Sequence, residues 1–158
     1  MKQGSPEPGA DLRADGLRFA LVVSRFNEFV TSRLMAAALE TLVSLGASRE
    51  AIAIHDVPGS FEIPQAARRV AETGKVDAIV CLGCLIRGAT PHFEYIASAV
   101  AHGLIDASGE TGVPMAFGVL TTNTVDEALE RAGEGPENKG REAALAAIEM
   151  ARLFRAIG

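Results

Sequence analysis

The chain has 158 residues, of which 48% are hydrophobic and 22% charged, enough for one domain with a sizeable core. Its formal net charge of -5 at pH 7 argues against a nucleic-acid binder whose affinity depends on neutralising phosphates. No apolar run of the sequence approaches the roughly 20 residues that cross a membrane, and two cysteines do not make a disulfide scaffold. Residues 1–15 are polar and lack the apolar stretch of a signal peptide. We therefore expect a flexible arm over residues 1–15, a single domain over residues 16–158 and a cytoplasmic protein.

Beyond the arm, short apolar runs alternate with segments whose apolar residues have helical spacing. After the first run, Leu34, Ala38, Leu42 and Leu45 recur at this spacing and Gly46 follows, which predicts a helix that ends at a glycine. The same alternation continues to the end of the chain. The predicted strands are 17–24, 51–57, 76–85 and 113–120, and the predicted helices are 31–45, 61–73, 90–108, 125–132 and 138–157.

Strands that alternate with helices predict crossover connections and a parallel sheet. The strands are continuously apolar, as in residues 78–82, which is typical of a sheet covered on both faces. We therefore expect an α/β fold, a three-layer α/β/α sandwich with a four-stranded parallel sheet and a flavodoxin-like appearance. Ligands of such sheets bind beyond the carboxyl ends of the strands, which indicates residues 24–27, 58–62, 84–92 and 121–123.

The segment from Cys84 to Glu94 combines the end of a strand, a glycine turn and the start of a helix. Thr90 suits the N-cap and Pro91 the first helical position, so the free N–H groups there would form an anion site. His92 falls in the first turn, where the helix dipole disfavours imidazolium and favours a neutral ring that can accept a proton. On the residues alone, an ordinary capped helix with an exposed histidine explains the segment equally well.

Three familiar motifs are incomplete or absent in this region. Residues 83–90 have the outline of a phosphate-binding P-loop, but Ala89 stands where the lysine is required, which argues against an NTPase. Cys81 and Cys84 have the C-x-x-C spacing of a redox pair. They fall in or at the end of a strand, where residues three apart point to opposite faces, and this favours a role as core residues. No G-x-G-x-x-G follows the first strand, so a dinucleotide-binding fingerprint is absent.

Side chains suited to ligand binding occur elsewhere as well. Phe26, at the end of the first strand, could stack on a flat heterocycle or simply pack. Glu62, at the start of the second helix, either complements the helix terminus or accepts hydrogen bonds from ligand hydroxyls. Arg131, Lys139 and Arg141 surround a loop rich in Gly and Pro. A guanidinium suits bidentate phosphate binding, although charges beside loops are usually only solvated.

Eight stretches, in order along the chain, resemble one known family, that of the lumazine synthases. The resemblance covers about residues 16–155 and is more specific than any single constellation above. The stretches are Arg25-Phe26-Asn27, Pro58-Gly59-Ser60-Phe61-Glu62-Ile63-Pro64, Ile86-Arg87-Gly88-Ala89-Thr90-Pro91-His92-Phe93-Glu94-Tyr95, Gly112-Val113-Pro114, Phe117-Gly118-Val119-Leu120-Thr121, Glu130-Arg131-Ala132-Gly133, Asn138-Lys139-Gly140 and Ala147-Ile148-Glu149-Met150.

The resemblance implies an enzyme of riboflavin biosynthesis that acts at the penultimate step. Its substrates would be 5-amino-6-(D-ribitylamino)uracil and 3,4-dihydroxy-2-butanone 4-phosphate. The amine would condense with the ketone to an imine, phosphate and water would be released, and the ring would close to 6,7-dimethyl-8-ribityllumazine. No metal or redox cofactor, nucleic acid or membrane partner is implied. The residues suit this chemistry, which needs an anion pocket, a flat apolar slot, a proton shuttle and alignment of the two reactants.

The resemblance also implies a role for each candidate residue. His92 would move protons during imine formation and elimination, and Phe26 would stack on the pyrimidine. Ala89 and Thr90 would bind phosphate through the helix terminus, with Arg131 as the counter-charge. The remaining substrate-binding residues are Ser60, Phe61 and Glu62, which would hold the ribityl chain; Leu85 and Ile86, which would present backbone groups to the ring, with Cys84 before them; Phe117, which would close the slot; and Lys139 and Glu142 nearby.

A homo-oligomer is a further implication of the resemblance. In this family the site lies between subunits, and Phe117, Arg131 and Lys139 would come from the next chain. The family forms pentamers, and some members pack twelve pentamers into a hollow icosahedral shell, with the arm along a neighbour's sheet. The loop at residues 133–140 is short, as in shell-forming members, but Gly135-Pro136-Glu137 departs from the lysine-containing loop typical of shells. Both the pentamer and the 60-mer therefore stay open.

Three rival interpretations are compatible with the sequence. A relative that binds a flavin or lumazine, or that serves mainly as a shell, would use the same slot without catalysis. A flavodoxin-like electron carrier would share the fold alone, and a thiol redox protein would use Cys81 and Cys84.

Overall fold

The computed structural model describes residues 12–158. The strands are β1 (Phe19–Ser24), β2 (Ile52–Val57), β3 (Ala78–Ile86) and β4 (Met115–Thr122). The helices are α1 (Glu28–Ser44), α2 (Ile63–Glu72), α3 (His92–Thr111), α4 (Val125–Arg131) and α5 (Lys139–Ile157), with short 3-10 helices at Arg49–Ala51 and Ser60–Glu62. No helix within this described part is long and apolar enough to span a bilayer.

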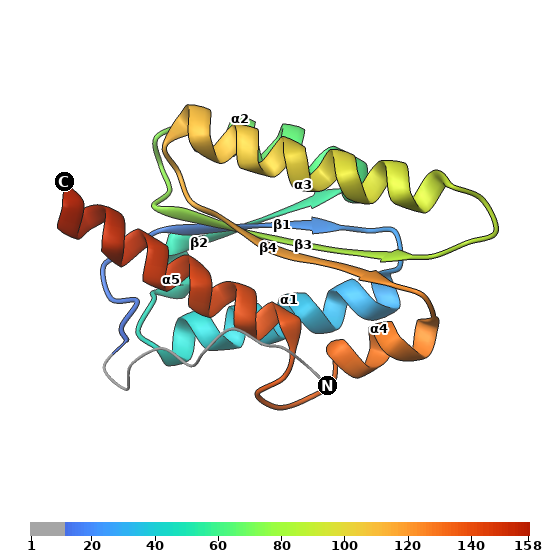
Figure 1. Ribbon diagram of the computed structural model, residues 1–158. Helices are drawn as coiled ribbons and strands as arrows, with labels where there is room; N and C mark the ends of the chain where they lie inside the picture. The colour runs from blue at the N-terminus through green and yellow to red at the C-terminus, as the bar shows by residue number, and fades with distance from the viewer. Residues whose placement is uncertain (1–11) are drawn as a thin grey trace.

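The four strands form one parallel sheet with the order β2-β1-β3-β4 (Figure 1). Helices α2 and α3 cover one face of the sheet, and α1, α4 and α5 cover the other (Figure 1). The predicted three-layer α/β/α sandwich is therefore confirmed.

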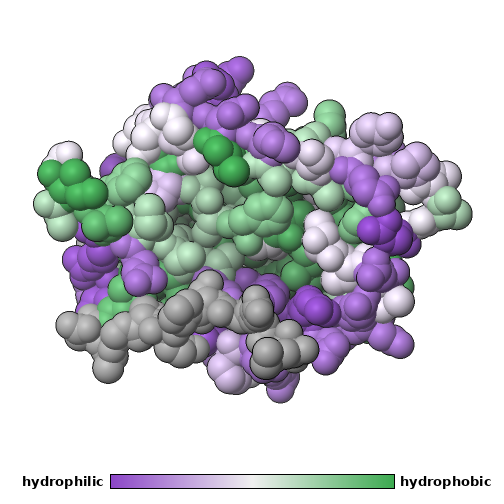
Figure 2. All heavy atoms as spheres, in the orientation of Figure 1, coloured by the Kyte–Doolittle hydropathy of each residue, from purple (hydrophilic) through white to green (hydrophobic). Residues whose placement is uncertain are grey.

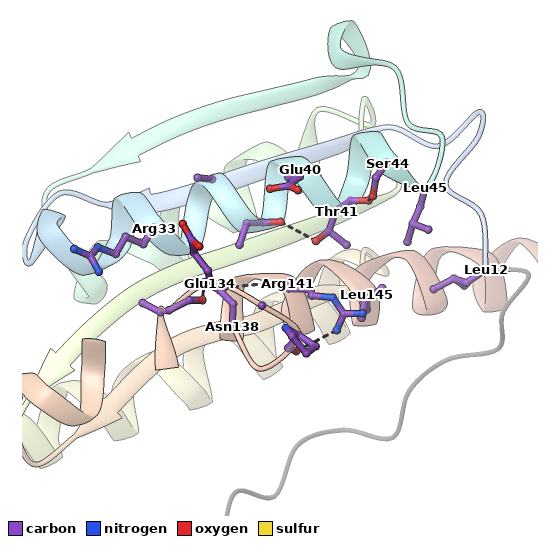
Figure 3. Close-up of a pocket in the computed structure, with 16 residues that line it drawn as sticks. Leu12, Arg33, Glu40, Thr41, Ser44, Leu45, Glu134, Asn138, Arg141 and Leu145 are labelled. Atoms are coloured by element: carbon purple, nitrogen blue, oxygen red, sulfur yellow. Dashed lines mark hydrogen bonds between the residues drawn. The ribbon is translucent and has the colours of Figure 1, made fainter. Parts of the chain in front are cut away.

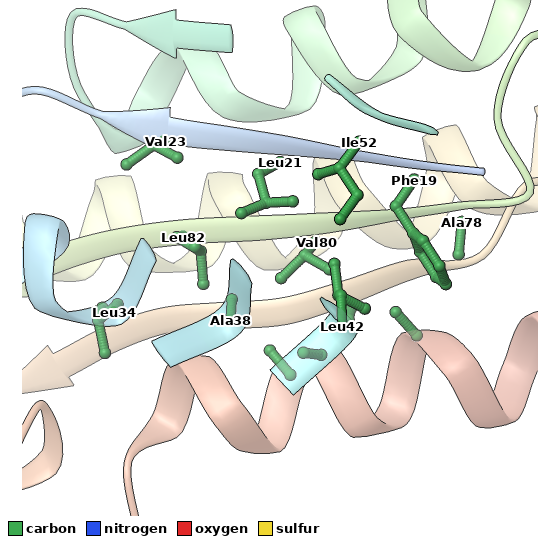
Figure 4. Close-up of a cluster of buried hydrophobic side chains, with 14 of the residues drawn as sticks. Phe19, Leu21, Val23, Leu34, Ala38, Leu42, Ile52, Ala78, Val80 and Leu82 are labelled. Atoms are coloured by element: carbon green, nitrogen blue, oxygen red, sulfur yellow. The ribbon is translucent and has the colours of Figure 1, made fainter. Parts of the chain in front are cut away.

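Two clusters of buried side chains hold the layers together, one on each face of the sheet. Leu21, Val80 and Leu82 point toward α1 and pack on Leu34 and its neighbours (Figure 4). Alternate residues of the same strands point to the other face, because successive side chains of a strand lie on opposite sides. That second cluster contains Ala20, Val22, Ile79, Cys81, Ile63, Ala67, Val100 and Leu104.

The expected arm is described only in part. Residues 1–11, and with them the predicted contact with a neighbour's sheet, lie outside the described residues. Ala14 is fully buried, and its N–H donates to the carbonyl of Leu45 at 2.9 Å. Residues 12–15 therefore pack at the C-terminal end of α1.

The start of α3 differs from the prediction. The helix begins at His92 with Pro91 as its N-cap, so the assignment of Thr90 to the N-cap and Pro91 to the first helical position is wrong. The backbone of Pro91 has φ -71° and ψ 1°, and its carbonyl accepts the first bond, from the N–H of Glu94 at 3.1 Å. No side chain caps this end. The first backbone N–H groups of α3 therefore have no intrahelical partner, as at any helix start.

At the opposite end of the sheet, Asp77 connects β1, β3 and α5. Its carboxylate accepts from the backbone N–H of Arg18 at 2.7 Å and from the Arg155 guanidinium at 3.4 Å. Burial acts to raise the pKa of Asp77, but the hydrogen bonds from the Arg18 side chain and backbone outweigh it, and the net shift is downward. A carboxyl whose pKa falls on folding stabilises the fold above its unfolded pKa and stops doing so as the pH falls through the folded value.

Asp77→Asn should therefore lower the free energy of unfolding by roughly 1–3 kcal/mol near neutral pH, because charged hydrogen bonds are lost. The deficit relative to wild type should shrink as the pH falls below the ordinary Asp pKa of about 3.9 and through the lowered pKa of folded Asp77, because the wild-type carboxyl is then protonated as well. Urea unfolding at one fixed protein concentration measures both values. Asp106→Asn, on the exposed surface of α3, is the matched control. A deficit that stays constant with pH would contradict the assigned role of the charge.

Candidate functional site

A cavity of about 780 Å³ lies beyond the carboxyl ends of β1, β2 and β3, at the right-hand end of the sheet in Figure 1. The chain passes from β1 to β2 on one side and then to β3 on the other, so the strand order reverses there. Open parallel sheets bind ligands in such a crevice. Its lining residues are Phe26, Pro58, Gly59, Ser60, Phe61, Glu62, Leu85, Ile86, Gly88, Thr90, His92, Phe93, Tyr95 and Ile96.

The cavity brings together the greater part of the residues that the sequence singles out. Three segments that are far apart in the sequence supply them: the end of β1, the turn after β2, and the end of β3 with the start of α3. The predicted site residues that line the cavity are Phe26, Ser60, Phe61, Glu62, Leu85, Ile86, Thr90 and His92.

Six predicted site residues do not line the cavity. Ala89 is exposed in the loop before α3, and the Cys84 side chain is buried on the face that α1 covers. The other four come from the second half of the chain: Phe117, Arg131, Lys139 and Glu142.

Exposed aromatic rings surround the cavity. The exposed fraction is 66% for Phe26, 60% for Phe61 and 74% for Tyr95. Several large exposed apolar side chains around one concave site mark a place where a ligand or partner binds. Tyr95 and Ile96 were not predicted, although helical spacing could have found them, since they lie three and four residues after His92 on one helix face.

Ser60 carries an unused hydrogen-bonding group at the floor of the cavity. Its side chain is buried, and its Oγ is the one buried side-chain nitrogen or oxygen of residues 12–158 that has no hydrogen-bond partner. Gly83 of β3 leaves room for it, because a Cβ there would lie 2.5 Å from this oxygen. A buried unpaired hydroxyl costs about 1–3 kcal/mol, which a ligand hydroxyl that bonds to Ser60 would recover.

Arg87 fastens the loop that leads from β3 to His92. Its backbone N–H donates to the Thr122 carbonyl at 2.8 Å, and its Nε donates to Asn123 Oδ1 at 2.8 Å, so the carboxyl ends of β3 and β4 are joined. The guanidinium forms an ion pair with Glu94 and lies 4.7 Å from the centre of the Phe93 ring. The Arg87 guanidinium therefore fixes the position of Phe93 and Glu94, which follow His92, and the Glu94 carboxylate offsets its charge. Sequence reasoning missed this residue, which stands inside one of the matching stretches.

The cations Arg131 of α4 and Lys139 of α5 each bind a partner in their own helix. Arg131, at the end of α4, donates to the Glu127 carbonyl at 3.0 Å, and Lys139 pairs with Glu142 at 2.7 Å. Phe117 belongs to β4, at the edge of the sheet, and is 47% exposed. In a single chain these residues do not complete the cavity.

A larger groove of about 1160 Å³ lies between α1 and the loop before α5 (Figure 3). Its lining contains no aromatic ring and no histidine. Its charged and polar side chains make local contacts, such as Thr41 to the Ala37 carbonyl at 2.7 Å and Arg141 to the Pro136 carbonyl at 3.1 Å. The smaller cavity, which combines aromatic surface, an unpaired hydroxyl and a histidine, is therefore the better candidate.

The two cysteines are poor candidates for thiol chemistry. Both are free and buried, and they lie on opposite faces of the sheet, as predicted. Burial raises the pKa of Cys81 to about 12 and that of Cys84 to about 11. Reactive cysteines have lowered pKa values that favour the thiolate, so this arrangement argues against a redox pair.

Known proteins resemble this chain over nearly its whole length. A family model described as 6,7-dimethyl-8-ribityllumazine synthase matches residues 16–155. A curated protein of Syntrophus aciditrophicus (strain SB), named 6,7-dimethyl-8-ribityllumazine synthase, is 51% identical over 146 residues, which cover 92% of this chain and 95% of that protein. The matched range contains every residue of the cavity.

Proposed function

The chain belongs to the 6,7-dimethyl-8-ribityllumazine synthase family, and we propose that the cavity between Phe26 and His92 is its active site. The enzyme condenses 5-amino-6-(D-ribitylamino)uracil with 3,4-dihydroxy-2-butanone 4-phosphate, a step of riboflavin biosynthesis. The observation that carries the assignment is the cavity itself: an exposed aromatic ring, a serine whose buried hydroxyl is unpaired and a histidine all belong to residues that line one crevice.

The uracil substrate binds between Phe26 and the end of β3. The Phe26 ring offers a flat apolar surface for the pyrimidine. Backbone groups alternate between the two edges of a strand, and Cys84 presents its carbonyl toward β1 while Arg87 donates toward β4. Ile86 therefore presents its backbone to the cavity beyond the end of β1. The hydroxyls of the ribityl chain bond to Ser60 and Glu62, with Phe61 and Leu85 against the chain.

The phosphate of the second substrate binds at the loop of Gly88, Ala89 and Thr90, where the free N–H groups of α3 favour an anion. Arg87 is already paired with Glu94, so a further cation has to balance the phosphate charge. We assign this role to Arg131 of a neighbouring subunit, together with Lys139.

His92 transfers the protons. Attack of the amine on the ketone carbon forms a C–N bond, and loss of water to the imine needs a proton on the leaving hydroxyl. Elimination of phosphate then removes a proton from carbon as the C–O bond to phosphate breaks. The imidazole of His92, beside the phosphate loop, can donate and accept in turn. Holding both reactants in one cavity supplies the alignment that the condensation requires.

We infer a homo-oligomer in which Phe117, Arg131, Lys139 and Glu142 of one chain complete the cavity of the next. The described part of a single chain supplies none of these residues to its own cavity. Apolar surface extends over β4 and the adjoining helices, where a neighbour would pack (Figure 2). Exposed apolar side chains of this region are Phe117, Met150, Leu153, Phe154 and Ile157. A pentamer, which the family resemblance implies, is one such assembly, and light scattering would separate it from a 60-mer. A cytoplasmic location stays a prediction.

The direct test of the function is to mix the purified protein with both substrates. Lumazine fluorescence and released phosphate should rise together, one phosphate for each lumazine. A protein that binds the lumazine product but forms none would instead be a non-catalytic relative, and the proposed function would be wrong.

Replacing Arg131 with alanine should weaken binding of the ketone phosphate specifically. We expect its KM to rise roughly 10- to 100-fold, because a charged hydrogen-bonded contact with the phosphate is lost, while the KM for the uracil substrate stays near the wild-type value. Steady-state kinetics with each substrate varied in turn measures this. Arg69→Ala, on the exposed surface of α2, is the control, and an unchanged KM for the phosphate in Arg131→Ala would contradict the assignment.

A further inference from the structure

Asn27, between β1 and α1, has an unusual backbone conformation. Its φ is 62° and its ψ is 44°, and it is the one residue other than glycine with a positive φ in residues 12–158. This left-handed conformation is unfavourable for residues with a Cβ, although Asn tolerates it better than others. Strained residues persist where their surroundings hold them, and they concentrate at functional sites.

The side chain of Asn27 crosses the gap between two strands at the cavity. The register of β1 and β3 ends at the pair Val23 and Leu82. Beyond it, the chain after β1 bonds toward β2, with the N–H of Phe26 donating to Pro58 at 3.1 Å. The Asn27 Nδ2 reaches back to β3 and donates to the carbonyl of Cys84 at 2.9 Å. The side-chain amide of Asn27 thus connects the segment that carries Phe26 to the end of β3, which forms the other wall of the cavity.

The backbone of Asn27 also fixes the direction of the chain behind Phe26. Its carbonyl accepts from the N–H groups of Val30 at 2.9 Å and Thr31 at 3.1 Å, which starts α1. Hydrogen bonds therefore hold both the backbone and the side chain of Asn27, the residue directly after Phe26. A substitution that frees this residue would let the 66% exposed Phe26 ring move relative to Ile86.

We propose that Asn27 is a positioning residue that sets the separation between Phe26 and the end of β3, and with it the affinity for the flat ring of the uracil substrate. The inference rests on the proposed function of the cavity. By taking the Cys84 carbonyl, Asn27 holds the strand end in place and leaves the backbone of Ile86 for the ligand. The phosphate loop is fastened separately, through Arg87 and Asn123, so binding of the ketone phosphate should not depend on Asn27.

Two substitutions separate the amide from the backbone conformation. Asn27→Gly accepts the positive φ without cost but loses the bond to Cys84. Asn27→Asp also tolerates this conformation but turns an acceptor toward the carbonyl of Cys84. Both variants should raise the KM for the uracil substrate about tenfold, and Asn27→Asp at least as much as Asn27→Gly, with the KM for the ketone phosphate within about twofold of wild type. Glu28→Gln, on the exposed first turn of α1, controls for general loosening of the helix start.

The KM for each substrate is measured for these variants and for wild type, in each case with the whole assembled protein, and the comparison tests the positioning role of Asn27. An active wild type with unchanged KM values in Asn27→Gly would overturn the positioning role and leave the proposed function standing. An equal rise of both KM values, matched by Glu28→Gln, would show a general structural effect and would also overturn it. A wild-type protein that forms no lumazine would remove the proposed function, and this inference with it.

Discussion

Replacing His92 with alanine should slow lumazine formation by roughly 100-fold or more, the usual scale for the loss of a general acid–base group. His92 is the first residue of α3, it is exposed, and it lines the cavity beside Thr90. Truncation at an exposed position leaves the fold and the phosphate loop intact, so kcat should fall while the KM values change little. Steady-state kinetics of the two-substrate reaction gives both quantities.

His102 provides a matched control on the same helix. It is exposed, and its Nδ1 contacts the carbonyl of Ser98 at 2.9 Å, away from the cavity. His102→Ala should turn over at the wild-type rate. Added imidazole should restore part of the activity of His92→Ala, because a free base can replace the missing ring in the emptied space. Wild-type turnover in His92→Ala would remove this residue from the mechanism.

Replacing Gly140 with alanine should destabilise the protein by about 1–3 kcal/mol or somewhat more, the usual cost of forcing an extra carbon into a packed core. Gly140 lies in the first turn of α5, directly against α1. A Cβ at this position would lie 2.7 Å from the carbonyl carbon of Leu34 and closer still to its oxygen. The obstacle is backbone, which cannot rotate away, so the two helices would have to separate.

Gly109→Ala is the matched control for this prediction. Gly109 lies in the last turn of α3 at an exposed position, and a Cβ there would meet no atom within 4 Å. Alanine should stabilise this helix by up to about 1 kcal/mol, because glycine is the poorer helix former. Thermal unfolding at one protein concentration compares the two variants. A Gly140→Ala protein as stable as wild type would show that α1 and α5 are not packed as closely as described.

The sheet and its layers could be predicted from the sequence because continuous apolar strands and helical spacing leave few alternative folds. The rule that ligands bind beyond the carboxyl ends of parallel strands also indicates the segment that contains His92. The N-cap of α3 was missed because Thr90 suits that position by type, whereas the loop geometry of Pro91 decides it. The role of Asn27 depends on a backbone conformation and on a contact with Cys84, 57 residues away, that no local pattern contains. Phe117 and Arg131 stay predictions, because their place depends on a neighbouring chain.

A crystal structure of the assembled protein with bound 6,7-dimethyl-8-ribityllumazine and phosphate would show directly where the heterocyclic ring binds. We expect the ring to be stacked on Phe26, a ribityl hydroxyl to be bonded to Ser60 Oγ, and phosphate to lie at Thr90 near His92. A ring bound in the groove between α1 and α5, or away from Phe26, would contradict this expectation.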